Sequence, residues 1–145
     1  MSTKYEDANL ILRLYELRRE DVMRKARNWF VGEFHPGSLK EIEAAVMGEY
    51  SAYYRMVTTY WDMAASFVNN GAIDEQMFND ANGEHMAVYA KIEPFISEIR
   101  AVPGREQYLK HLEKVVMNIP NASEKMSAFR ERMKQMAAAR AEAAS

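Results

Sequence analysis

The chain has 145 residues, the size of one domain, with 19 basic and 21 acidic residues and a formal net charge of −2. Because these charges nearly balance, electrostatics do not select nucleic acid or an anionic membrane as a partner. The sequence contains no cysteine, which excludes disulfides, cysteine nucleophiles and thiolate metal sites. No stretch reaches the about 18 uninterrupted apolar residues of a membrane span, and the N-terminus lacks an apolar signal core. We therefore expect a soluble, cytoplasmic protein that folds as one domain over residues 1–145.

A first helix is predicted over residues 4–31. Thr3 and Glu6 form a capping box at its start, and Gly32 stops it. Four consecutive charged residues, 18–21, interrupt its apolar face. This interruption predicts a bend at that point, or a part of the helix that projects from the bundle.

The segment 13–27 of this helix is rich in basic residues, and two interpretations stay open. It is either a basic strip for phosphate or an acidic partner, or a solvated helix face. In the second case the arginines and lysines are neutralised by ion pairs four residues apart, Glu20 with Arg24 and Asp21 with Lys25. A nucleic-acid face usually accompanies a net basic domain, so the near-neutral net charge favours the solvated face.

The stretch 38–71 is predicted to form one long helix around which the rest of the chain is organised. Ser38 and Glu41 form a capping box, and residues 69–71, Asn-Asn-Gly, end the helix. Its apolar residues recur seven apart, in ladders that include Leu39, Val46, Tyr53, Tyr60, Phe67 and Met47, Tyr54, Trp61, Val68. This face is wider than contact with one helix requires, so the helix needs neighbours on more than one side. Its length of roughly 45 Å predicts an elongated bundle.

A third helix is predicted over residues 75–101, with Asp74 as its N-cap. Gly83 and Pro94 interrupt its apolar pattern. Proline removes a backbone hydrogen bond inside a helix, so Pro94 predicts either a kink or two helices in place of one.

A fourth helix is predicted to follow Pro103, and a fifth to start at Asn121, paired with Glu124 as a cap. The alanine-rich end, residues 137–145, is expected to fray. The predicted fold is thus all-α: an elongated bundle of four to five helices in a single helical domain, with the second helix long and central.

Motifs that carry chemistry are missing from the sequence. It has no Glu-x-x-His pair, no His-Glu-x-x-His, no glycine-rich phosphate loop and no Gly-x-Ser-x-Gly. The sequence therefore predicts no metal ion and no cofactor. His85 lies on the apolar face of the third helix, and we expect a core histidine hydrogen-bonded to Thr59 or Tyr60. An enzyme that uses His85 or His111 is the least favoured interpretation.

Two sequence features of the middle third carry a resemblance to a known family. One is a long helix that ends in residues 71–74, Gly-Ala-Ile-Asp, and the other is a following helix that contains Pro94 and closes on residues 99–100, Ile-Arg. With these features the segment 49–100 resembles small all-helical bacterial proteins grouped as a family of unknown function. The resemblance implies a helical fold and assigns no functional residue.

The favoured function is a non-enzymatic interaction or scaffold domain, whose partner is another copy of the chain or a different protein. The predicted interaction face on the long helix consists of Met47, Tyr54 and Trp61. Burial of Tyr54 and Trp61 within a single chain would remove the reason for this hypothesis. The alternative is a small-molecule-binding bundle with a pocket between the second and third helices. That predicted pocket is lined by Tyr53, Tyr60, Met63 and His85.

Overall fold

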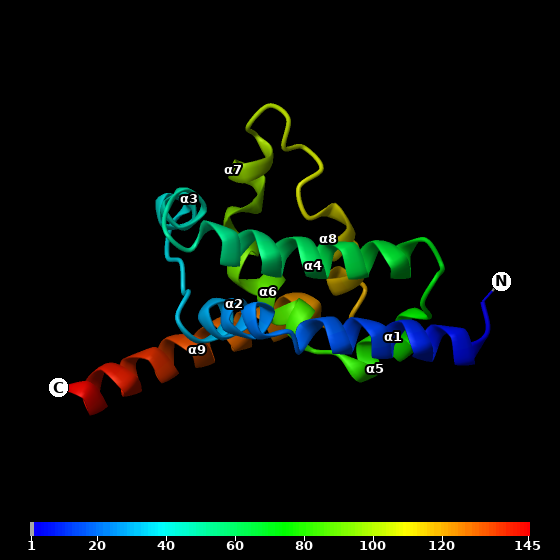
Figure 1. Cartoon of the computed structure of the whole chain (residues 1–145). Coiled ribbons are helices and arrows are strands. Elements are labelled where there is room, and N and C mark those ends of the chain that lie inside the picture. The colour runs from blue at the N-terminus through cyan, green and yellow to red at the C-terminus, as the bar shows by residue number, and fades with distance from the viewer. Residues whose placement is uncertain (1) are drawn as a thin grey trace.

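The computed structural model describes residues 2–145, which form nine α-helices and one 3-10 turn and no strand (Figure 1). The elements are α1 (Lys4–Arg18), α2 (Asp21–Gly32), α3 (Leu39–Met47), α4 (Ser51–Asn69), α5 (Glu75–Ala81), α6 (Glu84–Ile92), η1 (Glu93–Phe95), α7 (Ile96–Arg100), α8 (Lys110–Met117) and α9 (Ala122–Ala144). The predicted all-α class is confirmed. The predicted number of four to five helices is wrong, because each of the three long predicted helices is broken into shorter ones.

The first break separates α1 from α2 at the run of charged residues, where the sequence predicts a bend. The capping box of Thr3 and Glu6 starts α1 as expected. At the break, the Glu20 carboxylate accepts hydrogen bonds from the backbone N–H groups of Val22 and Met23. Glu20 is therefore the N-cap of a new helix, and a continuous helix cannot pass through it.

The second break divides the predicted helix 38–71 into α3 and α4. A Cβ atom at Gly48 would lie 2.7 Å from the backbone oxygen of Ala44, so only glycine fits where the chain turns. The remaining helix α4 has 19 residues and is roughly 28 Å long rather than 45 Å. It keeps the predicted central position, with α2, α3 and α8 packed around it. Figure 1 shows α1, α2, α4 and α9 lying roughly along one axis, with α4 antiparallel to the other three, while α3 and α7 cross them, so the elongated bundle is only partly realised.

The third predicted helix is broken at two places. Asp74 caps α5 as predicted, with its carboxylate accepting from Met77 N–H, but α5 ends at Ala81. Helix α6 then starts after Gly83 and gives way at Pro94 to the turn η1, which leads into α7. The disruption expected at Pro94 is confirmed.

The predicted start of the fourth helix is wrong, whereas the fifth helix starts as predicted, with Asn121 as its N-cap residue. Helix α8 begins at Lys110 rather than near Pro103, after Leu109 in the left-handed conformation with φ of 54°. Asn121, with φ of 58°, precedes α9 but makes no capping hydrogen bond. Helix α9 continues to Ala144, and residues 134–145 are all exposed. Fraying of residues 137–145 and the single-domain organisation stay predictions.

The core lies between α4 and the helices packed around it. Its largest fully buried side chains include Trp61, Tyr89, Phe30, Phe78 and Met126. The charged side chain of Lys91 in α6 is also buried. Its ammonium group donates to the carbonyl oxygens of Phe30, Val31 and Phe34 at 2.7, 2.9 and 2.7 Å. Lys91 thereby joins α6 to the C-terminal end of α2, where carbonyl groups lack helical partners.

Candidate functional site

A hollow of about 620 Å³ lies between α3, α4, α7 and the loop 101–109, and we call it the apolar groove. Its lining consists of Leu39, Ile42, Glu43, Val46 and Met47 from α3; Tyr54, Arg55, Thr58 and Thr59 from α4; Glu98 and Ile99 from α7; and Val102, Gly104, Arg105, Gln107 and Tyr108 from the loop. In Figure 1, α3 and α7 both stand above the same end of α4. The groove therefore has two helical walls and a helical floor.

The walls of the apolar groove expose large apolar side chains. Met47, the last residue of α3, is 85% exposed, and Val102 beyond α7 is 47% exposed. Each helical wall also contributes one acidic residue, Glu43 on α3 and Glu98 on α7. A concave apolar surface with polar residues among its lining is typical of a site that binds another molecule.

The floor of the apolar groove contains a pair of tyrosines. The hydroxyl groups of Tyr54 and Tyr108 lie 2.6 Å apart and share a hydrogen bond. Burial is the main cause that raises the pKa of both phenols above its usual value, so both are neutral at neutral pH. Neutral phenols position a ligand through hydrogen bonds but do not act as a base or nucleophile.

Arg100 fixes the loop by donating to the Tyr108 carbonyl and pairing with Glu113 at 3.0 Å.

His85 is 1% exposed and is packed in the core against the rings of Trp61 and Phe78. Its Nε2 lies 2.9 Å from the Asn79 side-chain oxygen, so the partner is neither of the predicted hydroxyls, and Nδ1 is buried without a partner. Burial, with a smaller effect of the nearby Arg18, lowers the pKa of His85 to about 4. His85 is therefore a neutral core residue at neutral pH. It lies beside a mostly polar hollow of about 420 Å³ between α5 and the α8–α9 connection.

The four residues of the predicted pocket do not come together. Tyr60 turns toward α1, where its hydroxyl donates to the Leu14 carbonyl. Tyr53 packs near the ring of Trp29, and Met63 is partly exposed. His85 is packed between Trp61 and Phe78, so Tyr53, Tyr60, Met63 and His85 contact different neighbours. The seven-residue ladder placed Tyr53 and Tyr60 on one face, but it could not show that α1 and α2 cover that face.

The predicted interaction face is also divided. Tyr54 and Trp61 are 3% and 1% exposed, because helices of the same chain cover them, so the width of this face no longer gives a reason to expect a partner. The indole N–H of Trp61 donates to Glu84 of α6 at 3.0 Å. Only Met47 of the predicted face is at the surface, where it borders the apolar groove. The loop residues of the groove were missed because they belong to no periodic pattern.

The ion pairs that were expected to neutralise the basic segment 13–27 are not formed within the part of the chain that the structure describes. Glu20 caps α2 instead of pairing with Arg24, and Arg27 pairs with Glu84 of α6.

His111, the other histidine considered, is exposed and lies 3.2 Å from the Asn69 amide. Among residues 2–145, no group of three or more acidic or histidine side chains could hold a metal ion. None of the helices described is both long enough and apolar enough to cross a membrane.

Comparison with known proteins gives one match. The model of a family described as a domain of unknown function, DUF4760, matches residues 4–119. This range extends on both sides of the segment 49–100 that carries the resemblance to a family of unknown function, and it covers α1 to α8. No curated protein and no solved structure matches the chain. The chain therefore belongs to the DUF4760 family of domains of unknown function.

Proposed function

We propose that this protein is a non-enzymatic interaction domain that self-associates through the apolar groove. The occupant of the groove is the end of α9 from a second copy, residues 133–144, which we call the α9 arm. The observation that carries the proposal is that one chain exposes apolar side chains both in the apolar groove and on the α9 arm. Helix-in-groove binding of this kind buries an apolar helix stripe between two helical walls.

The α9 arm has the features of such a helix. It continues past the last buried residue of α9, Phe129, and extends away from the rest of the molecule (Figure 1). Met133 and Met136 lie three residues apart and therefore on one face of the helix; Met133 is partly buried against the core of its own chain, and Met136 is 48% exposed. Arg140 connects the arm to its own chain by donating to the Gly32 carbonyl at 3.1 Å. A helical end with so few contacts gains stability when another surface covers its apolar stripe.

The two surfaces also carry charges that can pair. The α9 arm has Lys134, Arg140 and Glu142, and the lining of the groove has Glu43 and Glu98 on its helical walls together with Arg55 and Arg105, so each surface carries both signs of charge. Methionine side chains are flexible and adapt to irregular apolar surfaces, which suits a groove lined by Val46, Met47 and Val102. Because the arm and the groove are different surfaces, the contact is head-to-tail. It gives a closed dimer or ring if the geometry closes and a longer chain if it does not.

Native mass spectrometry and light scattering of the purified protein test this proposal. The expected result is an oligomer that dissociates on dilution. Met47→Glu, in the groove, and Met136→Glu, in the arm, should each weaken association at least about tenfold, because a charge would be buried against an apolar surface. Met117→Glu is the matched control, because Met117 of α8 is also an exposed methionine but lies outside the groove.

Mixing the two variants gives a sharper result. Met47→Glu keeps an intact arm and Met136→Glu keeps an intact groove, so the mixture should form a one-to-one complex that neither variant forms alone. A protein that stays monomeric at every concentration overturns the proposal. So does an oligomer that persists in both variants.

A second candidate function is small-molecule binding in the same groove. Its volume of about 620 Å³ lies within the range of ligand pockets, about 300–1,000 Å³, and the Tyr54–Tyr108 pair can hold a polar group at the floor. A monomer that carries a co-purified adduct in native mass spectrometry, lost in Tyr108→Phe, would favour this function over self-association.

A further inference from the structure

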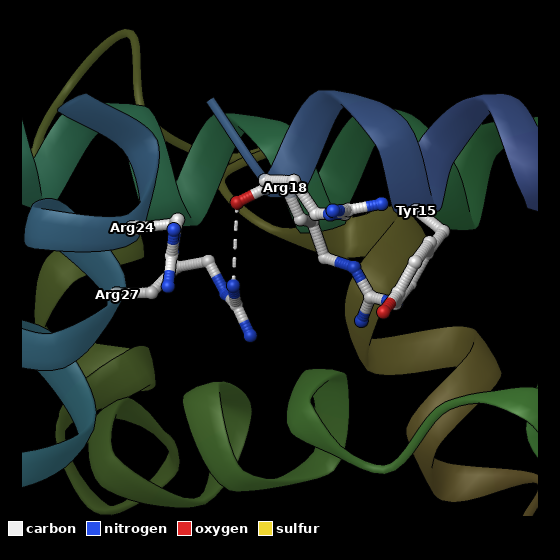
Figure 2. A pocket seen from close by; sticks show the side chains of 5 residues that line it. Tyr15, Arg18, Arg24 and Arg27 are labelled. Atoms are coloured by element: carbon white, nitrogen blue, oxygen red, sulfur yellow. Dashed lines mark hydrogen bonds between the residues drawn. The ribbon is translucent and has the colours of Figure 1, made fainter. Parts of the chain in front are cut away.

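Four arginines line a second hollow, of about 310 Å³, at the break between α1 and α2 (Figure 2). We call this hollow the arginine pocket; it is lined by Tyr15, Arg18, Arg19, Arg24 and Arg27. Figure 2 shows Tyr15 and Arg18 reaching it from α1 and Arg24 and Arg27 from α2. The lining contains no acidic residue, although four positive charges at close range repel one another.

Arg18 is held in place by aromatic rings. Its guanidinium carbon lies 5.3 Å from the ring centre of Tyr15 and 5.2 Å from that of Trp61. Its Nε is buried without a hydrogen-bond partner. Its backbone carbonyl accepts from Arg27 Nη1 at 3.3 Å, a contact drawn in Figure 2. Stacking fixes the plane of the guanidinium and leaves its N–H groups available for an anion.

Only one of the four arginines has an acidic partner within the described part of the chain. Arg27 donates from Nε to both oxygens of Glu84, at 3.2 and 2.9 Å, and Glu84 also accepts from Trp61. Arg19 and Arg24 are exposed and form no ion pair among residues 2–145. The neighbouring acid that could neutralise Arg24 is Glu20, but its carboxylate caps α2. Three of the four arginines of the pocket therefore form no side-chain ion pair among residues 2–145.

We propose that the arginine pocket binds the phosphate groups of a small soluble ligand, most strongly a diphosphate. Guanidinium groups bind phosphate oxygens through paired, charge-assisted hydrogen bonds. A carboxylate carries one charge in one plane, whereas a diphosphate presents several oxygens in different directions to arginines from two helices. The net charge of −2 argues against a nucleic-acid surface, which usually needs a basic domain. This site is separate from the apolar groove and does not depend on the proposed self-association.

Isothermal titration calorimetry of the full chain with inorganic pyrophosphate at low salt tests the site. Arg19→Gln and Arg24→Gln should each weaken binding at least about tenfold, because each removes charge-assisted hydrogen bonds from an exposed position. The matched control is Lys25→Gln, which removes the same charge from the neighbouring position of α2 but lies outside the lining. The affinity of Lys25→Gln for pyrophosphate should stay close to that of the unmodified protein.

A variant with increased affinity separates binding from folding. Glu84→Gln keeps an acceptor for the Trp61 N–H and removes the one negative charge that faces Arg27. Pyrophosphate should bind this variant several-fold more tightly, because Arg27 then loses its ion-pair partner. A folding defect alone cannot produce tighter binding.

Three outcomes overturn the proposal. The first is the absence of pyrophosphate binding by the unmodified protein. The second is an equal loss of affinity in Lys25→Gln and Arg24→Gln, which indicates only long-range attraction. The third is sedimentation with phosphatidylserine vesicles that requires Arg19 and Arg24 while pyrophosphate does not bind, since this assigns the arginines to a membrane surface.

Discussion

Lowering the pH should destabilise the protein through His85, because the folded chain has no favourable site there for an imidazolium ion. The ring is enclosed by Trp61 and Phe78, and the nearby positive charge is Arg18. Burial first, and Arg18 second, lower the pKa of His85 from 6.5 to about 4 in the folded chain. The unfolded chain keeps the ordinary value because water surrounds the imidazole.

The direction and size of the effect follow from these two pKa values. Between them the unfolded chain binds the proton and the folded chain does not, so stability rises with pH in this range. The full stability is present above about pH 6.5 and is lost as the pH falls toward about 4. Going from about pH 7.5 to about pH 4.5 should lower the free energy of unfolding by about 2.5 kcal/mol through His85 alone, at about 1.4 kcal/mol for each pKa unit.

Urea unfolding across this pH range measures the effect, with His85→Gln as the reference. The glutamine amide can donate to Asn79 in place of Nε2 but does not titrate, and carboxylates contribute equally to both proteins. The difference in unfolding free energy between the two proteins should therefore change by about 2.5 kcal/mol. Parallel curves would refute the reasoning, as would an NMR titration in which the His85 ring protonates near its ordinary pKa.

Three further substitutions test contacts elsewhere in the fold. Gly48→Ala should cost more than about 1 kcal/mol, because its Cβ would lie 2.7 Å from the Ala44 carbonyl; a melting temperature equal to that of the parent would contradict this. Lys91→Met should cost about 2 kcal/mol, because three carbonyls at the end of α2 lose their donor. Hydrogen exchange of the α2 amides should be faster in Lys91→Met, and unchanged protection of these amides would contradict the prediction. Tyr108→Phe should lower the free energy of unfolding in urea by about 1 kcal/mol, because it removes the hydrogen bond to Tyr54; an unchanged unfolding curve would contradict this prediction.

Two capping signals in the sequence predicted local structure correctly, whereas the cap at Asn121 and the ion pairs of the basic segment did not form among the described residues. Thr3 with Glu6, and Asp74 with Met77, make the capping contacts expected of them, because each contact joins residues only three positions apart. Gly48 was harder to interpret. A single glycine inside an apolar helical pattern is compatible with a continuous helix, and the apolar ladders continue across this position. Only the contact with the preceding turn shows that the helix ends there.

The candidate site could not be predicted because its contacts join distant parts of the chain. Tyr54 meets Tyr108 from 54 positions away, and Tyr108 lies in a loop without periodicity. The width of the apolar face around Trp61 was correctly recognised, but its cause was misassigned to a partner. Breaking the long helices yields more elements than expected, and these cover α4 from several sides within one chain. Apolar width alone does not distinguish a neighbour in the same chain from a second molecule.

The two halves of α9 have a practical consequence for where the chain can be cut. The family match ends at residue 119, yet Met126 and Phe129 beyond it are buried, and Arg130 donates to the Ala90 carbonyl of α6. A fragment that stops at the family boundary would leave an apolar strip of α6 and α8 open to water and would be prone to aggregation. A fragment that stops after Met133 keeps these contacts and lacks most of the α9 arm. We therefore expect the smallest stable fragment of this protein to be longer than the segment by which its family is recognised.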